Sequence, residues 1–114
     1  MGRTEVVMRL EVYVIVIVMV RQIRPLIERI EKRDANLADQ LRRAVTSVPL
    51  NLSEGAYSHG GNVRARFHTA LGSAAEVRAC LDVAEALGYL EDVDPVLRDN
   101  LDRVIATLHR LTRR

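Results

Sequence analysis

Apolar residues recur at alternating intervals of three and four in the second half of the chain, and this spacing constrains the fold more than any other feature. It lines one face of an α-helix and is typical of the seams of helical bundles. One seam contains Phe67, Ala70, Ala74, Val77, Leu81 and Ala84. A second contains Leu97, Leu101, Val104, Leu108 and Leu111. A third stripe contains Leu37, Leu41, Ala44 or Val45, Val48 and Leu52. These stripes predict an all-α protein.

Capping and breaking residues set the expected ends of the helices. Asp34 or Asn36 can cap the second helix, and Asp92 or Asp94 the fourth, because these side chains accept hydrogen bonds from free backbone N–H groups. The expected helices span about 4–32, 35–58, 62–88 and 94–112. A chain of 114 residues supports one core, so residues 1–114 are expected to form a single domain. Short connections favour an antiparallel up-down-up-down four-helix bundle.

The run VYVIVIVMV, residues 12–20, is the most apolar part of the chain. It is too short for a membrane span, which needs about 20 apolar residues. Glu5 and Glu11 interrupt the segment before it, and no small-residue cleavage site follows, so a signal peptide is not expected either. We therefore expect a cytoplasmic protein.

Taken alone, this run fits a buried strand as well as a helix, because Val and Ile are mediocre helix formers. No other segment alternates, so a strand would lack a partner, and a helix is expected. A four-helix bundle buries one face of such a helix, and soluble monomers avoid large exposed apolar patches. The second face therefore predicts a homo-oligomer. The residues expected at its interface are Val12, Val14, Ile15, Val16, Val18 and Met19.

The stretch SVPLNLSEG places a proline inside the second helical stripe. Pro49 has no N–H to donate, so a kink is expected there, and Ser47 and Asn51 can bond the backbone groups that it frees. Gly55 in this helix and Gly72 in the next are expected to let the two helices approach closely. We interpret the stretch as a packing device rather than a catalytic loop or a phosphate cradle.

Asn51 and Glu54 lie three residues apart and have two interpretations. They could bind a ligand together. Alternatively, Asn51 caps the kink and Glu54 pairs with an arginine or with Ser73, because a buried carboxylate must be paired. We favour the second interpretation.

Several short motifs occur together between Gln40 and Tyr89. They comprise Gln40 to Ala44, Ser47, Val48, Pro49, Asn51, Glu54, Gly55, Phe67, Gly72, Ser73, Glu76, Leu87, Gly88 and Tyr89. This pattern, which covers about half of the chain without a gap, resembles the family of four-helix bundle proteins also described as 23S ribosomal RNA intervening-sequence proteins. The accessory variability protein of diversity-generating retroelements is a member.

The resemblance implies a small cytoplasmic bundle that forms a homo-oligomer, pentameric in some members, with no enzymatic activity and no catalytic residues. For the retroelement branch it implies binding to a reverse transcriptase and to RNA through a basic surface. The expected structural motif is Ser47, Pro49, Asn51, Glu54, Gly55, Gly72, Ser73 and Glu76. The unbroken Val/Ile/Met run departs from the mixed first helix of the family, so an engineered assembly variant is an alternative.

Basic residues supply the candidates for nucleic-acid contact. They are Arg42, Arg43, Arg64, Arg66, Arg110, Arg113 and Arg114. Phosphate binding needs several such groups on one face, and stacking on single strands needs aromatic side chains among them. The formal net charge is only +2, and an ordinary solvated face explains these arginines better.

Other chemistry finds little support in the sequence. The three histidines are not spaced i,i+3 or i,i+4, Glu-x-x-His is absent, and HGGN lacks the Gly-Lys-Ser/Thr ending of a phosphate loop. Cys80 in a helical pattern reads as a small buried residue rather than a reactive thiol. We therefore expect no metal, cofactor or small-molecule substrate. The expected function is a non-enzymatic oligomeric scaffold or interaction module, and the alternative is an RNA-binding accessory protein.

Overall fold

Four α-helices make up the fold in a computed structural model that describes residues 2–57 and 61–113. They are α1 (Arg3–Glu31), α2 (Ala35–Tyr57), α3 (Gly61–Ala86) and α4 (Pro95–Thr112). The described residues contain no strand, so the all-α prediction is confirmed. Each helix begins and ends within two residues of its expected bounds.

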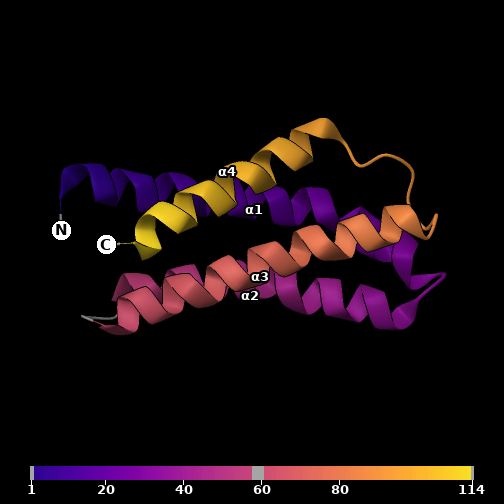
Figure 1. Ribbon diagram of the computed structural model, residues 1–114, viewed down its shortest axis with the longest axis horizontal. Coiled ribbons are helices and arrows are strands. Elements are labelled where there is room, and N and C mark those ends of the chain that lie inside the picture. The colour runs from indigo at the N-terminus through magenta and orange to yellow at the C-terminus, as the bar shows by residue number, and fades with distance from the viewer. Residues whose placement is uncertain (1, 58–60, 114) are drawn as a thin grey trace.

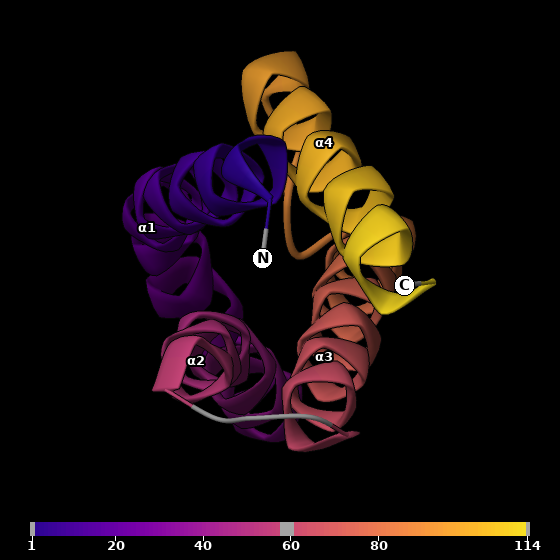
Figure 2. The same ribbon diagram turned by 90° about the vertical axis from the view of Figure 1, so that its left-hand side faces the viewer.

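Consecutive helices run in opposite directions, and the first and last helices have their chain termini at the same end of the bundle (Figure 1). Seen along the bundle axis, α1, α2, α3 and α4 follow one another around a ring (Figure 2). Extensive contacts join each helix to its two neighbours in this ring, and α1 and α3 lie opposite each other. The molecule measures 45 × 24 × 20 Å.

Capping side chains fix where α2 and α4 begin. The Oδ1 atom of Asp34 accepts a hydrogen bond from the N–H of Leu37 at 2.9 Å, and Asp94 accepts one from Val96 at 2.9 Å. Gly88 follows the end of α3 with φ at +75°, a conformation that suits glycine. The N–H of Tyr89 then returns to the Ala84 carbonyl at 2.9 Å, which closes the helix end.

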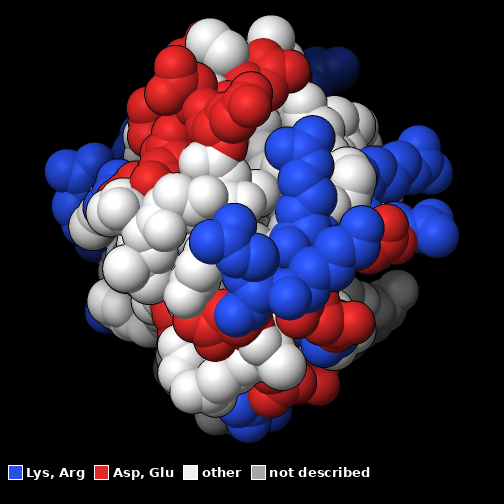
Figure 3. All heavy atoms as spheres, turned by 90° about the vertical axis from the view of Figure 1, so that its right-hand side faces the viewer, with Lys and Arg blue, Asp and Glu red and all other residues white. Residues whose placement is uncertain are grey.

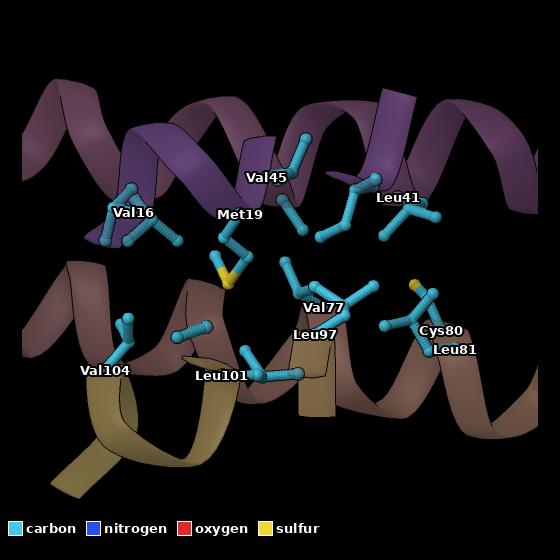
Figure 4. Close-up of a cluster of buried hydrophobic side chains, with 14 of the residues drawn as sticks. Val16, Met19, Leu41, Val45, Val77, Cys80, Leu81, Leu97, Leu101 and Val104 are labelled. Carbon is cyan, nitrogen blue, oxygen red and sulfur yellow. The ribbon is translucent and has the colours of Figure 1, made fainter. Parts of the chain in front are cut away.

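The core consists mainly of aliphatic side chains from all four helices (Figure 4), with Phe67 as its aromatic member. The close-up labels Val16 and Met19 of α1, Leu41 and Val45 of α2, Val77, Cys80 and Leu81 of α3, and Leu97, Leu101 and Val104 of α4. The Cys80 thiol lies among them, as expected for a small buried residue. Burial raises the pKa of this thiol, and the nearby Glu76 carboxylate raises it further.

The run at residues 12–20 is helical, so the strand alternative is wrong. One face of α1 is buried from Val12 onward, where it consists of Val12, Val16, Met19, Ile23, Ile27 and Ile30. Three residues expected at an oligomer interface, Val12, Val16 and Met19, therefore belong to the core. The sequence run is uniformly apolar, so it did not indicate which side faces inward.

Helix α2 continues through Pro49. A bend at this residue stays a prediction. Helix α2 packs between α1 and α3.

A carboxylate anchors the connection from α3 to α4. Glu85 accepts a hydrogen bond from the N–H of Val93 at 3.0 Å and pairs with Arg98, which also pairs with Asp82 at 2.9 Å. The backbone hydrogen bond from Val93, followed by the interactions with Arg98, lowers the pKa of Glu85 against the opposing effect of its partial burial. These contacts fix the α3–α4 connection and the start of α4 to the end of α3.

Candidate interaction surface

Hydrogen bonds tie the SVPLN stretch of α2 to α3 and to its own backbone. The Ser73 hydroxyl lies 2.7 Å from that of Ser47. The Asn51 amide donates to the Ser47 carbonyl at 2.9 Å and lies 3.0 Å from the Ser47 hydroxyl. These contacts give Ser47, Asn51 and Ser73 structural roles.

Arg66 of α3 links both members of the proposed Asn51–Glu54 pair. It forms an ion pair with Glu54 at 2.9 Å and donates to the Asn51 side-chain oxygen at 3.4 Å. Glu54 is exposed, so it is not the buried carboxylate that the sequence suggested. The expected pairing of Glu54 with an arginine is present, and the arginine comes from α3 of the same chain.

Close packing occurs at Gly55. A Cβ atom placed on Gly55 would lie 2.7 Å from Cε1 of the buried Phe67 ring. The Arg9 guanidinium covers the same ring, 4.9 Å from its centre, and also pairs with Glu5. Phe67 therefore sits in contact with both the α2 backbone and Arg9, which joins three helices at one end of the bundle.

The expected packing role of Gly72 is wrong. Gly72 is exposed, and a Cβ atom placed on it would have no other heavy atom within 4 Å. It lies on the outer side of α3, whereas Ser73, one residue further on, points toward α2. A helix turns about 100° per residue, so neighbouring residues face different sides.

The remaining motif residue, Glu76, borders a shallow polar groove between α2 and α3. The groove is lined by Gln40, Arg43, Ala44, Ser47, Ser73 and Glu76. Its one basic group, Arg43, pairs with Asp39 at 2.9 Å. The two serine hydroxyls that line the groove, those of Ser47 and Ser73, are hydrogen-bonded to each other.

The outer face of α1 carries an apolar surface that the bundle leaves uncovered. The exposed residues are Val6, Val7, Leu10, Tyr13, Val14 and Val18, and the half-buried Ile17 lies among them. We call these seven residues the α1 outer face. Leu10 keeps 64% of its surface exposed and Val14 61%, so neither is a rim residue of the core.

Two of the predicted interface residues, Val14 and Val18, lie on this face, and Ile15 is partly buried against α4. Val6, Val7 and Leu10 precede the unbroken run and were not predicted, and Tyr13 lies within the run but was not among the predicted interface residues. The signal was present: Val7, Leu10, Val14 and Ile17 follow a 3-4-3 spacing. This second seam begins before the apolar run, at Val7, and includes Val14 and Ile17 within the run.

Beside this face, a groove of about 510 Å3 runs between α1 and α4. Its lining includes the apolar residues Val7, Met8, Val12 and Ile15 and the charged residues Arg3, Glu11, Arg103 and Arg110. The groove extends the apolar area on one side of the α1 outer face.

The predicted nucleic-acid residues divide into two groups. Arg42 pairs with Glu31 at 2.8 Å, Arg43 with Asp39, and Arg66 with Glu54. By contrast, Arg64, Arg110 and Arg113 are exposed and form no ion pair among the described residues. These three lie where α3 begins and α4 ends, at one end of the bundle (Figure 1). Arg114 lies outside the described residues.

The opposite end of the bundle has a mixed charge. Acidic side chains gather over one part of it, beside a basic group (Figure 3). The α3–α4 connection and the start of α4 supply the exposed acids Glu91, Asp92, Asp94 and Asp99. The exposed Lys32 and Arg33 lie at the α1–α2 connection.

Metal-binding and membrane-spanning features are absent from the described part of the chain. Within residues 2–57 and 61–113, no three His, Cys, Asp or Glu side chains lie close enough together to hold a metal ion. His59 of the HGGN stretch lies outside these residues. None of the helices, over the residues described, carries an apolar stretch of the length that a bilayer requires.

Comparison with known families agrees with the resemblance drawn from the motifs. The family model described as 23S rRNA-intervening sequence protein matches residues 8–110. No curated protein and no solved structure matches the chain. The matched region contains all four helices except a few terminal residues, so it extends well beyond the motif segment.

Proposed function

Starting from the finding that the chain belongs to the 23S rRNA-intervening sequence protein family, we propose that it is a non-enzymatic, homo-oligomeric scaffold or interaction module. The α1 outer face carries this proposal. A continuous apolar face on an exposed helix is the usual mark of a protein contact.

Energetics support self-association through this face. Full burial of a Val or Leu side chain stabilises by about 1.5–3 kcal/mol relative to exposure. The residues of the α1 outer face are partly covered already, so each contributes roughly half of that, or about 1 kcal/mol. Several such residues on one helix, together with the adjoining groove, supply the apolar core that an interface needs.

A scaffold role also fits the polar features. The motif side chains Ser47, Asn51 and Ser73 bond one another, and Glu54 pairs with Arg66. These contacts hold α2 and α3 together. Catalysis needs a positioned nucleophile, acid or base near a substrate site.

The proposal is tested by the mass of the purified chain in solution. Light scattering coupled to size exclusion is expected to give a multiple of 12.8 kDa for the unmodified chain. The double variant Val14→Glu, Val18→Glu should give the monomer mass, because it places charge on the contact while Glu remains a good helix former.

The control is Ser53→Glu, at an exposed position of α2, which adds one negative charge to the surface outside the α1 outer face. It should assemble like the unmodified chain. A well-behaved monomer for the unmodified chain would refute the proposal, and so would an unchanged mass for the double variant with normal helical circular dichroism.

One observation favours RNA binding as a second function. Arg64, Arg110 and Arg113, which form no ion pair with the residues that the structure describes, bring positive charge to one end of the bundle, and oligomerisation would repeat this patch in every copy. Repetition raises avidity even when each copy makes few phosphate contacts. The family description itself refers to ribosomal RNA, which suggests the ligand to test first.

Filter binding at low salt distinguishes the two functions. If RNA is bound, Arg64→Glu with Arg110→Glu and Arg113→Glu should reduce retention at least tenfold, and retention should fall steeply with salt. Arg42→Glu with Arg43→Glu serves as the comparison, because these arginines already have acidic partners. No retention of structured or single-stranded RNA at micromolar protein would leave the scaffold function alone.

A further inference from the structure

We propose that the groove between α1 and α4 is the docking site for an amphipathic helix of a different protein, one with acidic residues along the edge of its apolar face. This inference rests on the proposed role as an interaction module. It adds a contact beside the α1 outer face and the chemistry of the partner that this contact takes.

Basic side chains predominate around this groove. Arg3, Arg103 and Arg110 line it, and none of them forms an ion pair with a residue that the structure describes. A second hollow on α4 shares Arg110 and adds Arg113, which has no such pair either. Of the described residues that line the groove, Glu11 alone is acidic. The groove therefore carries an excess of positive charge.

The exposed acids of α4, Asp99 and Asp102, do not line the groove. Asp99 precedes Arg103 by about one helical turn, but no ion pair joins the two side chains. Asp102 is next to Arg103 in the sequence, so it points about 100° away from it around the helix. The arginines of the groove are thus left to an acidic partner from outside the chain.

The lining of the groove has the spacing that a docked helix requires. On α1 the apolar residues Met8, Val12 and Ile15 follow a 4-3 spacing, and on α4 Arg103 and Arg110 lie seven residues apart. Seven residues are about two helical turns, or about 10.5 Å. A partner helix along the groove therefore meets both arginines with acidic residues seven positions apart, while its apolar stripe contacts α1. Charged residues flank an apolar seam in this way in coiled coils.

The length of the groove also suits a helix. At 1.5 Å per helical residue, the stretch of α1 from Arg3 to Ile15 spans about 18 Å. This length accommodates roughly three turns of a partner helix. Such a helix laid in an apolar groove is a common mode of peptide recognition.

RNA matches this groove less well than an acidic helix. Its phosphates can contact the arginines, but unpaired bases stack on aromatic side chains, and the described lining residues include none. The aliphatic residues Val7, Met8 and Ile15 would stay uncovered. An apolar stripe with acidic edges uses both parts of the lining.

The charge of the α1 outer face disfavours a second copy of the chain as the occupant. Exposed Arg3 and Arg21 lie at the two ends of that face. Their charge has the same sign as that of the groove, and like charges brought together oppose association. The occupant that the charges favour is therefore a different protein.

The other two grooves of the described surface differ in charge. In the groove between α2 and α3, Arg43 already pairs with Asp39. In the groove beside the α3–α4 connection, Arg29 lies with three acids of that connection. Basic groups without an acidic partner therefore combine with an apolar lining at the groove between α1 and α4.

Three synthetic peptides test the chemistry of the partner. The Glu peptide is an amidated helix of about 21 residues with Leu at positions a and d of each heptad and Glu at e and g. The Lys peptide has Lys in place of each Glu. The scrambled peptide keeps the composition of the Glu peptide but has no apolar stripe. Fluorescence anisotropy at low salt should give the Glu peptide a Kd at least tenfold below those of the other two. Added salt should reduce its advantage over the Lys peptide.

Reversal of two charges on α4 locates the site. Arg103→Glu with Arg110→Glu should bind the Lys peptide at least tenfold more tightly than the Glu peptide, a gain that unfolding cannot produce. The matched control is Arg64→Glu with Arg78→Glu, which changes the net charge equally. Both of its positions are exposed on α3, lie outside the groove and have no ion pair with a described residue. This control should keep the preference for the Glu peptide.

Four results would overturn the inference. Equal binding of the scrambled peptide would show a site for any polyanion, RNA included. An unchanged preference after the reversal on α4 would place the peptide elsewhere. Absence of binding at high micromolar peptide would leave the groove without this partner. A monomer mass for the α4 variant beside an assembled unmodified chain would assign the groove to a second copy. A monomeric unmodified chain that binds the Glu peptide would instead refute the proposed self-association and support the docking site.

Discussion

Replacing two glycines by alanine should change stability in opposite directions. Gly55 and Gly72 both lie inside helices, where alanine is favoured over glycine by roughly 0.5–1 kcal/mol. A methyl group on Gly72 enters open space, so Gly72→Ala should gain this amount. On Gly55 the same methyl group would lie 2.7 Å from Cε1 and 3.2 Å from Cδ1 of Phe67.

The Phe67 ring cannot easily yield. It is 2% exposed, and the Arg9 guanidinium lies over it. Overpacking a core in this way costs about 1–3 kcal/mol, which outweighs the gain in helix propensity. Gly55→Ala should therefore destabilise the fold by about 0.5–2 kcal/mol. Gly72→Ala should raise the melting temperature by roughly 3–5 °C, and Gly55→Ala should lower it by several degrees.

Thermal unfolding followed by circular dichroism measures both changes. The protein concentration must be fixed, because a self-associating chain gains apparent stability with concentration. Phe67→Leu in the Gly55→Ala background should recover part of the loss, which a double-mutant cycle detects as coupling between the two sites. Equal stabilisation by both alanines would refute the close contact between Gly55 and Phe67.

Three further predictions concern single side chains. The pKa of Glu85 in the folded state lies below its ordinary value of 4.5, so its contribution to stability is present above about pH 5 and is lost as the pH falls through the folded-state pKa. Glu85→Gln should therefore flatten the acidic part of a profile of unfolding free energy against pH. An unchanged slope would argue against the contact with Val93. Ser73→Ala and Asn51→Ala should each cost about 0.5–1.5 kcal/mol in urea unfolding, because each removes a hydrogen bond at Ser47. The Cys80 thiol should react with a maleimide at least tenfold more slowly in the native protein than in denaturant, since it is buried and its pKa is raised; equal rates would place it at the surface.

The helical fold followed from local patterns in the sequence. Heptad spacing in the second half of the chain identified α3 and α4, and Asp34 and Asp94 indicated where α2 and α4 begin. Such signals are local because a helix satisfies its hydrogen bonds within a few residues. The family could be recognised from the segment between Gln40 and Tyr89, because its motifs are short runs of residues that can be read directly from the sequence.

The sequence held a spacing signal for the α1 outer face, but it did not show which side of α1 faces the core. In the uniformly apolar run of α1, spacing could not separate Val12, Val16 and Met19, which are buried, from Val14 and Val18, which are exposed. The sequence also shows where a glycine lies but not which side chain packs against it. Gly55 and Gly72 were therefore given the same role, although only Gly55 is in close contact with another helix.

The sequence by itself determined that this chain forms four helices and that one of them has more apolar surface than a bundle can bury. Only the tertiary structure decided which side of that helix faces out, which arginines have acidic partners, and that α1 and α3 lie opposite each other. The physical reason is range. Helix formation depends on residues three and four positions apart, whereas the exposure of a side chain depends on where the other three helices pack.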